Sequence, residues 1–408
     1  GRVEQHVGLG RIGIAQHADA DAVGEQAAAA EAGEGDGEAG GRGEGFFGES
    51  RGAGGLAGDE GSAGPVVVGD VDGDGDLDVF VGGRVKGGRY PEAGASRLGR
   101  NEGGQWVEDG EAGRALSGAG MVSGAIWSDL DGDGLPELVL SCEWGPVRVY
   151  QNRGGRLEEA TERWGLEKEL GWWNGVAAGD LDGDGRMDLV VGNWGRNTGY
   201  EETVGGELRL YHGDVDGNGT WDVIEGQWDG EQKRVMPRRD WKTVGQAISG
   251  VAEQFGSYRA YGEAGLEEIY GKGLKGMKEL RARTLESKVF LNRGGHFEGK
   301  ALPWEAQVAP VFGVCVGDYD GDGAEDVFVS QNFFGTDAET GRYDGGRGLW
   351  MRGDGKGGVK AVAGQESGVR MYGEGRGAAL GDYDQDGRVD LVVGQNGGPV
   401  QLYRNRRG

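Results

Sequence analysis

Residues 175–195 read GVAAGDLDGDGRMDLVVGNWG and contain the pattern that recurs along the chain. Carboxylates occupy positions 1, 3, 5 and 9 of a loop that begins at Asp180, and Gly185 at position 6 permits a sharp turn. Side-chain oxygens at this spacing, with the backbone carbonyl of position 7 between them, surround a hard cation such as Ca²⁺. An EF-hand needs helical flanks and Glu at position 12, but these flanks are short apolar runs and position 12 is Val191. The stretch therefore predicts a calcium-binding turn between two β-strands.

Five further copies of this turn follow the same plan, and glycine holds position 6 in all six. The EF-hand glutamate at position 12 occurs only in the fourth copy, as Glu225. Six such turns between strands make Ca²⁺ the expected cofactor, with up to six ions bound. The candidate ligands are Asp70, Asp72, Asp74, Asp76 and Asp78; Asp129, Asp131, Asp133, Leu135 and Glu137; Asp180, Asp182, Asp184, Arg186 and Asp188; Asp214, Asp216, Asn218, Thr220 and Asp222; Asp318, Asp320, Asp322, Ala324 and Asp326; and Asp382, Asp384, Asp386, Arg388 and Asp390, where position 7 contributes only its carbonyl.

The composition favours many tight turns over long helices. The chain has 408 residues, and its 91 glycines are about three times the usual share. The formal net charge is −26, and six Ca²⁺ ions would offset nearly half of it. An acidic surface repels phosphates, so nucleic acid is not an expected partner.

The location and the assembly state follow from fewer features. Cys142 and Cys315 lie in or beside apolar strand-like runs, which favours two buried free thiols over a disulfide.

No apolar run approaches the ~20 residues of a membrane span. The chain begins without Met and shows no secretory apolar region, so we expect a fragment or processed form. Loops with this many carboxylates suit millimolar calcium, which indicates an exported or extracellular protein. We expect a monomer.

The chain divides into three parts by composition. Residues 1–44 are rich in Gly, Ala and Glu and are expected to be poorly ordered. Residues 45–408 carry the repeats. Within them, residues 229–286 change to a helical period and predict a helical hairpin inserted into the repeat structure.

Each repeat predicts four antiparallel strands. A strand ends at the first Asp, a second strand follows the acidic turn, and a third ends at a hairpin turn such as residues 152–155 before a fourth short run. Recurrence of such units is typical of an all-β fold, the β-propeller of four-stranded blades. The last unit stops at its hairpin turn, so we expect residues 46–50 to supply its outer strand and close the ring.

From about residue 65 to the end, the chain resembles the FG-GAP (VCBS-like) repeat proteins, and most closely the bacterial proteins of the ASPIC/UnbV group related to cartilage acidic protein. The ASPIC/UnbV segment itself is absent from the sequence. The resemblance implies a seven-bladed propeller, whereas six turns leave six blades open. The motif that carries the resemblance is a glycine five residues before the first Asp of a turn, preceded in one copy by phenylalanine. It occurs at Phe312-Gly313, Gly124, Gly175 and Gly377.

Two functional classes remain open. The first is a non-catalytic propeller that presents a ligand-binding or adhesion surface to a protein or a carbohydrate; the second is a polysaccharide lyase, or another carbohydrate-active enzyme, on the same scaffold. Loops after the second strands combine amides with aromatic rings, which would suit a sugar or a peptide, although we favour packing between blades for these side chains. The residues of these loops are Glu143, Trp144, Asn193, Trp194, Gln227, Trp228, Gln331, Asn332, Phe333, Phe334, Gln395 and Asn396. We expect no catalytic residues in the chain.

Overall fold

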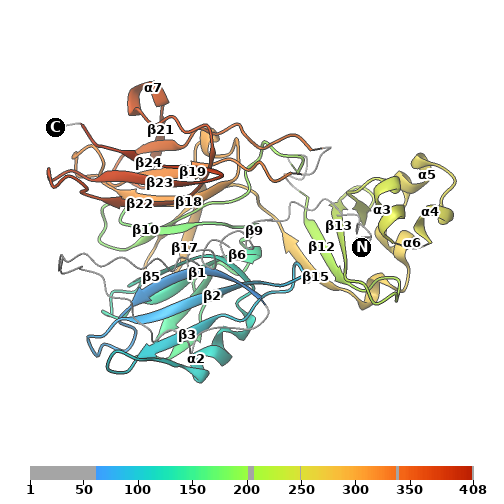
Figure 1. Ribbon diagram of the computed structural model, residues 1–408, viewed down its shortest axis with the longest axis horizontal. Helices are drawn as coiled ribbons and strands as arrows, with labels where there is room; N and C mark the ends of the chain where they lie inside the picture. Colours follow the sequence, from blue (N-terminus) through green and yellow to red (C-terminus); the bar gives the residue numbers. More distant parts are fainter. Residues whose placement is uncertain (1–60, 201–205, 249, 337–339, 407–408) are drawn as a thin grey trace, which may run out of the picture.

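The computed structural model describes residues 61–200, 206–248, 250–336 and 340–406. The described chain is built from antiparallel β-sheets with a few short helices, as Figure 1 shows. This confirms the all-β class and the four-stranded sheets expected from the repeats.

Five of the sheets share one plan. In each, the first strand pairs with the second across an acidic turn, and the second pairs with the third. In four of them a fourth strand follows on the outside, whereas the last sheet has three strands among the described residues. The five sheets are β1 (Gly61–Gly69), β2 (Asp78–Lys86), β3 (Arg97–Asn101) and β4 (Trp106–Glu108); β5 (Met121–Ser128), β6 (Glu137–Pro146), β7 (Arg148–Asn152) and β8 (Leu157–Glu159), with β9 (Leu170–Trp172) also on β6; β10 (Val176–Gly179), β11 (Asp188–Val191), β16 (Lys288–Asn292) and β17 (Phe297–Ala301); β18 (Val311–Gly317), β19 (Asp326–Gln331), β20 (Leu349–Gly353) and β21 (Val359–Val362); and β22 (Glu374–Gly381), β23 (Asp390–Asn396) and β24 (Gly398–Tyr403).

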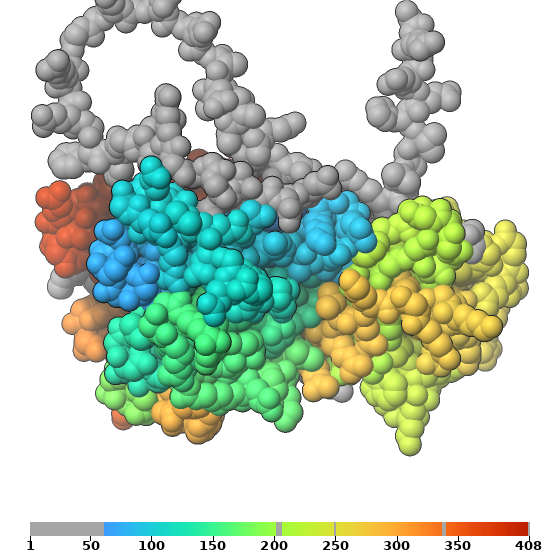
Figure 2. Space-filling model, turned by 90° about the horizontal axis from the view of Figure 1, so that it is seen from below, coloured from blue at the N-terminus to red at the C-terminus, as the bar shows by residue number. Residues whose placement is uncertain are grey.

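A sixth sheet departs from this plan. It has the order β14-β13-β12-β15, so the first strand of its acidic turn, β12, is internal. In the sequence, its strands lie between β11 and β16, which pair with each other in the third sheet. Figures 1 and 2 show the sixth sheet projecting from one side of the other sheets. The fourth acidic turn therefore lies in an insertion. The strands are β12 (Leu208–Gly213), β13 (Asp222–Asp229), β14 (Arg234–Pro237) and β15 (Lys278–Ala282).

The helical part of this insertion differs from the hairpin expected over 229–286. That segment begins and ends with strands, and its helical residues form four short helices with a 3₁₀ turn. Glycines at the helix junctions break the period, because glycine is costly inside a helix. The helices are α3 (Trp241–Ala247), α4 (Val251–Gln254), α5 (Tyr258–Glu263), α6 (Leu266–Tyr270) and η5 (Leu274–Gly276).

Other helical elements are short connections between sheets. Among the described residues, no helix is both long enough and apolar enough to cross a membrane. These connections are α2 (Gly110–Ala115), η3 (Leu116–Gly118), η6 (Trp304–Ala306) and α7 (Gly364–Ser367).

The hydrophobic core is divided among the interfaces between neighbouring sheets. Phe80 and Leu98 of the first sheet pack with Leu138 and Tyr150 of the second, and all four are at most 1% exposed. Similar clusters join the second sheet to the third, the third to the β18–β21 sheet, and that sheet to the last. Each sheet therefore buries its apolar faces against its neighbours, as blades of a propeller do.

The first strands of the five sheets lie side by side and approach very closely. A β-carbon built at Gly124 would be 2.6 Å from the carbonyl oxygen of Asn174, and one at Gly313 would be 2.3 Å from that of Arg376. The strand pairing also shifts register beside Gly124 and Gly313, as it does within β1 and β22. Gly124, Gly175 and Gly313 are thus required by the close approach of one sheet to the next, whereas a β-carbon at Gly377 in the last sheet would meet nothing within 4 Å.

Within the described residues, the five sheets form an open arc and no ring closure is seen (Figure 1). The number of blades therefore remains a prediction. The expectations for residues 1–44 and for a closing strand at residues 46–50 fall outside the described residues.

Candidate metal centres

Each acidic turn is folded by its own carboxylates. The Gly185 amide at position 6 donates to Asp180 Oδ2 at 2.9 Å, and the same bond recurs in the other five turns at 2.8–3.0 Å. This geometry needs a positive φ at position 6, where the six glycines have φ of 83–94°. The position-1 carboxylates of the other turns are Asp70, Asp129, Asp214, Asp318 and Asp382.

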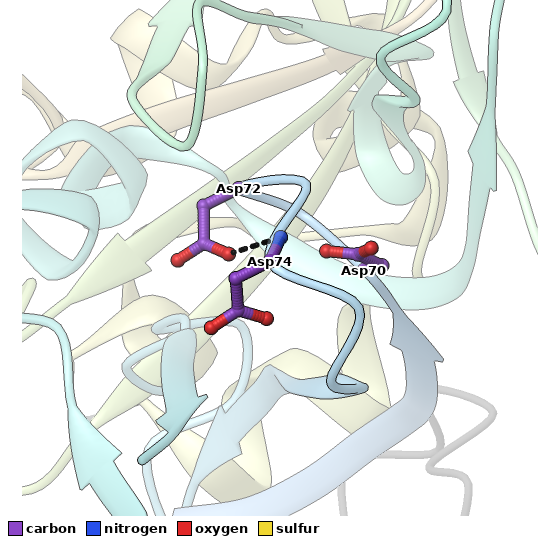
Figure 3. A group of neighbouring side chains, drawn as sticks. All are labelled: Asp70, Asp72 and Asp74. Atoms are coloured by element: carbon purple, nitrogen blue, oxygen red, sulfur yellow. Dashed lines mark hydrogen bonds between the residues drawn. The ribbon is translucent and has the colours of Figure 1, made fainter.

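The position-5 side chains turn back on the loop in the same way. The position-7 amide donates to the position-5 side-chain oxygen at 2.6–3.0 Å in all six turns. Figure 3 shows the first turn, where the Asp74 amide also donates to Asp72 Oδ1 at 3.3 Å. The turns are therefore shaped to present several carboxylates on one side of a tight loop.

The position-9 carboxylates connect each turn to the rest of its sheet. Asp188 accepts the Leu181 amide at 3.0 Å within the turn and, at 2.7 Å, the amide of Asn292, the last residue of β16. In four more sheets the position-9 carboxylate accepts the two corresponding backbone amides. The longest of these bonds, 3.5 Å, runs from the Asn152 amide to Glu137. All six position-9 side chains are at most 3% exposed. The corresponding residues are Asp78, Glu137, Asp222, Asp326 and Asp390.

Burial makes several of these carboxylates hard to ionise in the absence of a cation. Burial raises the pKa of Glu137 to about 7 and that of Asp188 to about 6, and nearby carboxylates of the same turns add to both shifts. Burial also raises the pKa of Asp222 and of Asp326. A bound cation would reverse this effect, because an adjacent positive charge favours the ionised form.

The turns bring together the residues that a calcium ion requires. In five of them, three carboxylate oxygens lie within 4.8 Å of one another, and one further such group exists among the described residues. Calcium binds oxygen at 2.3–2.6 Å, so ligands on opposite sides of the ion lie up to about 5 Å apart. The donor set and its spacing fit Ca²⁺. The groups are Asp70, Asp72 and Asp74; Asp129, Asp131 and Glu137; Asp180, Asp182 and Asp188; Asp214, Asp216 and Asp222; and Asp318, Asp320 and Asp326.

The only position-12 glutamate lies outside its turn. Glu225 is 5% exposed and accepts a hydrogen bond from the Tyr200 hydroxyl at 2.6 Å. Its other oxygen lies 2.7 Å from Arg239 Nε. Glu225 therefore holds Tyr200 and Arg239 within the insertion. The candidate ligands of the fourth turn occupy the same positions as those of the other turns.

Seven of the twelve aromatic and amide loop residues are buried, whereas Gln227, Trp228, Phe334, Gln395 and Asn396 are half-buried. Trp144, Trp194 and Phe333 are at most 3% exposed and belong to one cluster, in which Trp194 stacks on Trp172 with ring centroids 4.1 Å apart. Leu208 and Leu210 of the insertion join this cluster. The amides serve the backbone: Asn193 Nδ2 donates to Thr284 O and Glu286 O, and Asn332 Nδ2 donates to Gly346 O and Gly373 O. These loops thus connect the sheets and the insertion.

Sequence reasoning found the hairpin turns but missed their links to the acidic turns. Asn152 Nδ2 donates to Val71 O at 2.7 Å, which joins the second sheet to the turn of the first. Asn292 Nδ2 donates likewise to Leu130 O at 2.8 Å in the turn of the second sheet. Recurrence of Asn at one place in the hairpin turns was the available signal, but the sequence does not identify the partner.

Comparisons with known proteins agree with this architecture. Residues 93–191 match the model of the FG-GAP-like repeat. Cartilage acidic protein 1 of Mus musculus is 24% identical over 297 residues, covering 69% of this chain and 41% of that protein. The Homo sapiens protein is 25% identical over 299 residues, covering 69% and 40%. The chain thus spans about two fifths of the length of these relatives.

Solved structures show weaker likeness. The V. cholerae biofilm matrix protein Bap1 has a TM-score of 0.29 at 11% identity, with 82% of this chain and 66% of that chain covered. BBS1N, solved in complex with ARL6DN, also has a TM-score of 0.29 at 10% identity, with 84% and 91% covered. Such scores define no shared architecture. On its sequence matches, this chain carries an FG-GAP-like repeat and is similar to cartilage acidic protein 1.

Proposed function

We propose that this chain is a non-catalytic, calcium-stabilised FG-GAP-type propeller, exported from the cell, that presents a binding or adhesion surface to a protein or a carbohydrate. The observation that carries the proposal is the convergence of carboxylates in turns that all join a first strand to a second strand. Each ion would remove repulsion within one turn and fix one hairpin, so the metal would act on the scaffold.

The reactive side chains favour a non-catalytic role. Burial raises the pKa of Cys142 and of Cys315 to about 12, so neither thiol is a ready nucleophile. His212 is 4% exposed, and burial lowers its pKa. The position-9 carboxylates are occupied by backbone amides, which suits a ligand-holding role better than proton transfer.

A candidate binding surface lies at the end of the sheets opposite the acidic turns. Trp304 precedes β18 and is 52% exposed, with the Arg196 guanidinium 5.7 Å from its ring centroid. Tyr372 precedes β22 and is 61% exposed, with Arg347 5.2 Å from its ring. Exposed rings beside guanidinium groups provide a flat apolar platform with hydrogen-bond donors, which suits sugar rings or peptide side chains.

The experiment is a glycan and protein array probed with the full chain in calcium and in EDTA. We expect calcium-dependent binding that weakens at least about tenfold in a Trp304→Ala/Tyr372→Ala variant. Tyr383→Ala is the control, because Tyr383 is 70% exposed but lies in the sixth acidic turn. Release of unsaturated products from an acidic polysaccharide, seen as ultraviolet absorbance, would instead establish a lyase.

A further inference from the structure

The position-3 carboxylates of the five arc sheets are each contacted by an arginine of the same sheet. Arg293 Nη1 donates to Asp182 Oδ2 at 2.5 Å, and Arg352 Nε lies 2.8 Å from Asp320 Oδ2. Arg293 and Arg404 directly follow the third strands of their sheets, Arg352 and Arg100 are the next-to-last residues of β20 and β3, and Arg163 follows β8. The remaining pairs are Arg100 with Asp72 at 3.7 Å, Arg163 with Asp131 at 3.9 Å, and Arg404 with Asp384.

In the third turn, the two oxygens of the position-3 carboxylate have different surroundings. Asp182 is 11% exposed, and Arg293 holds its Oδ2. Its Oδ1 is buried without a hydrogen-bond partner. Asp182 also belongs to the carboxylate group with Asp180 and Asp188 whose oxygens lie within 4.8 Å of one another. A buried carboxylate oxygen without a donor is costly, and a cation in the turn would satisfy it.

We propose that these arginines are positioning residues for the metal, and that Arg293 is the clearest case. Arg293 fixes the rotamer of Asp182 through one oxygen and leaves the other available to the ion. Metal ligands are commonly oriented by outer partners of this kind, whose loss costs tenfold to a hundredfold in metal affinity. Calcium binding in the turn thereby depends on the hairpin that carries Arg293. This inference rests on the proposed calcium-binding role of the turns.

The chain supplies a matched control for this residue. Arg153 occupies the same place in the sequence Asn-Arg-Gly-Gly of the second sheet. Its side chain is exposed and, within the described part of the chain, forms no ion pair or hydrogen bond; only its backbone amide donates, to Arg156 O. Arg153→Gln removes the same charge from an equivalent hairpin without removing a carboxylate partner.

The test is hydrogen exchange of the full chain, read on peptides that cover residues 180–191 and titrated with Ca²⁺. We expect Arg293→Gln to raise the calcium concentration for half-maximal protection of this turn at least about tenfold. Arg153→Gln should leave it unchanged, and Arg293→Lys should restore part of the loss. Exchange without calcium should match the unmodified chain, which separates positioning from a fold defect.

Three results would overturn the inference, and they are distinguishable. An unchanged calcium midpoint in Arg293→Gln would leave the calcium site intact and remove the role of Arg293. A lowered midpoint would show that Arg293 competes with the ion. Absence of any calcium-dependent protection in the unmodified chain would instead overturn the proposed calcium-binding function itself.

Discussion

Gly175 lies directly against Phe312 of the next sheet: a β-carbon built at Gly175 would be 1.9 Å from the Phe312 carbonyl oxygen. The contact belongs to a row of close approaches between successive first strands, which bring neighbouring sheets close enough to share a core. The spacing of the sheets therefore depends on a position without a side chain.

Gly175→Ala is expected to destabilise the protein by about 1–3 kcal/mol or more, because one of two backbones must move. The control is Gly377→Ala, at the same sequence position in the last sheet, where a β-carbon would meet nothing within 4 Å. That change should stay within about 0.5 kcal/mol. Urea unfolding measures both, and equal losses would indicate that a further sheet covers Gly377 in solution.

Asp188→Ala should cost about 2–4 kcal/mol even in EDTA, since two buried backbone amides, Leu181 and Asn292, lose their acceptor. Asp222→Ala is the matched change in the insertion. Asp222 accepts the Val215 amide, and no second backbone amide is recorded for it among the described residues, so the loss should be about half as large. Calorimetric or urea-unfolding data that give the same loss for both variants would contradict the connecting role of Asp188.

The stability of the metal-free protein should depend on Glu137 in a defined pH window. The pKa of Glu137 is raised from 4.5 to about 7 in the folded state, so the folded chain retains a proton that the unfolded chain loses within this range. The stabilising contribution is complete below about pH 4.5 and disappears as the pH rises through 7. In EDTA, the unfolding free energy of the unmodified chain relative to Glu137→Gln should therefore fall between pH 5 and pH 7.5. A constant or rising difference would contradict the buried, protonated carboxyl.

The sequence predicted the parts of the fold that depend on local chemistry. Glycine at position 6 and side-chain oxygens at positions 1, 5 and 9 fold each turn through bonds within a few residues, so the turns and their flanking strands could be predicted directly. Calcium ligation by these residues remains a prediction. Gly124, Gly175 and Gly313 were noticed as part of a family pattern, but only the neighbouring sheet explains why they must be glycine.

Features that depend on distant contacts could not be predicted. The third sheet takes β16 from nearly a hundred residues after β11, so the insertion could not be recognised from strand patterns alone. The local signs of it were the change to a helical period over residues 229–286 and the short spacing between the third and fourth turns, which begin at Asp180 and Asp214. The pairing of Arg293 with Asp182 likewise joins residues 111 apart in the sequence, across that same insertion.

Direct measurement of bound calcium tests the central claim. Equilibrium dialysis of the full chain should find several calcium ions per molecule, up to six, and EDTA should lower the melting temperature by at least about 5 °C, since even one site at saturating calcium contributes a few kcal/mol. A chain that retains no calcium and melts identically in calcium and in EDTA would contradict the account.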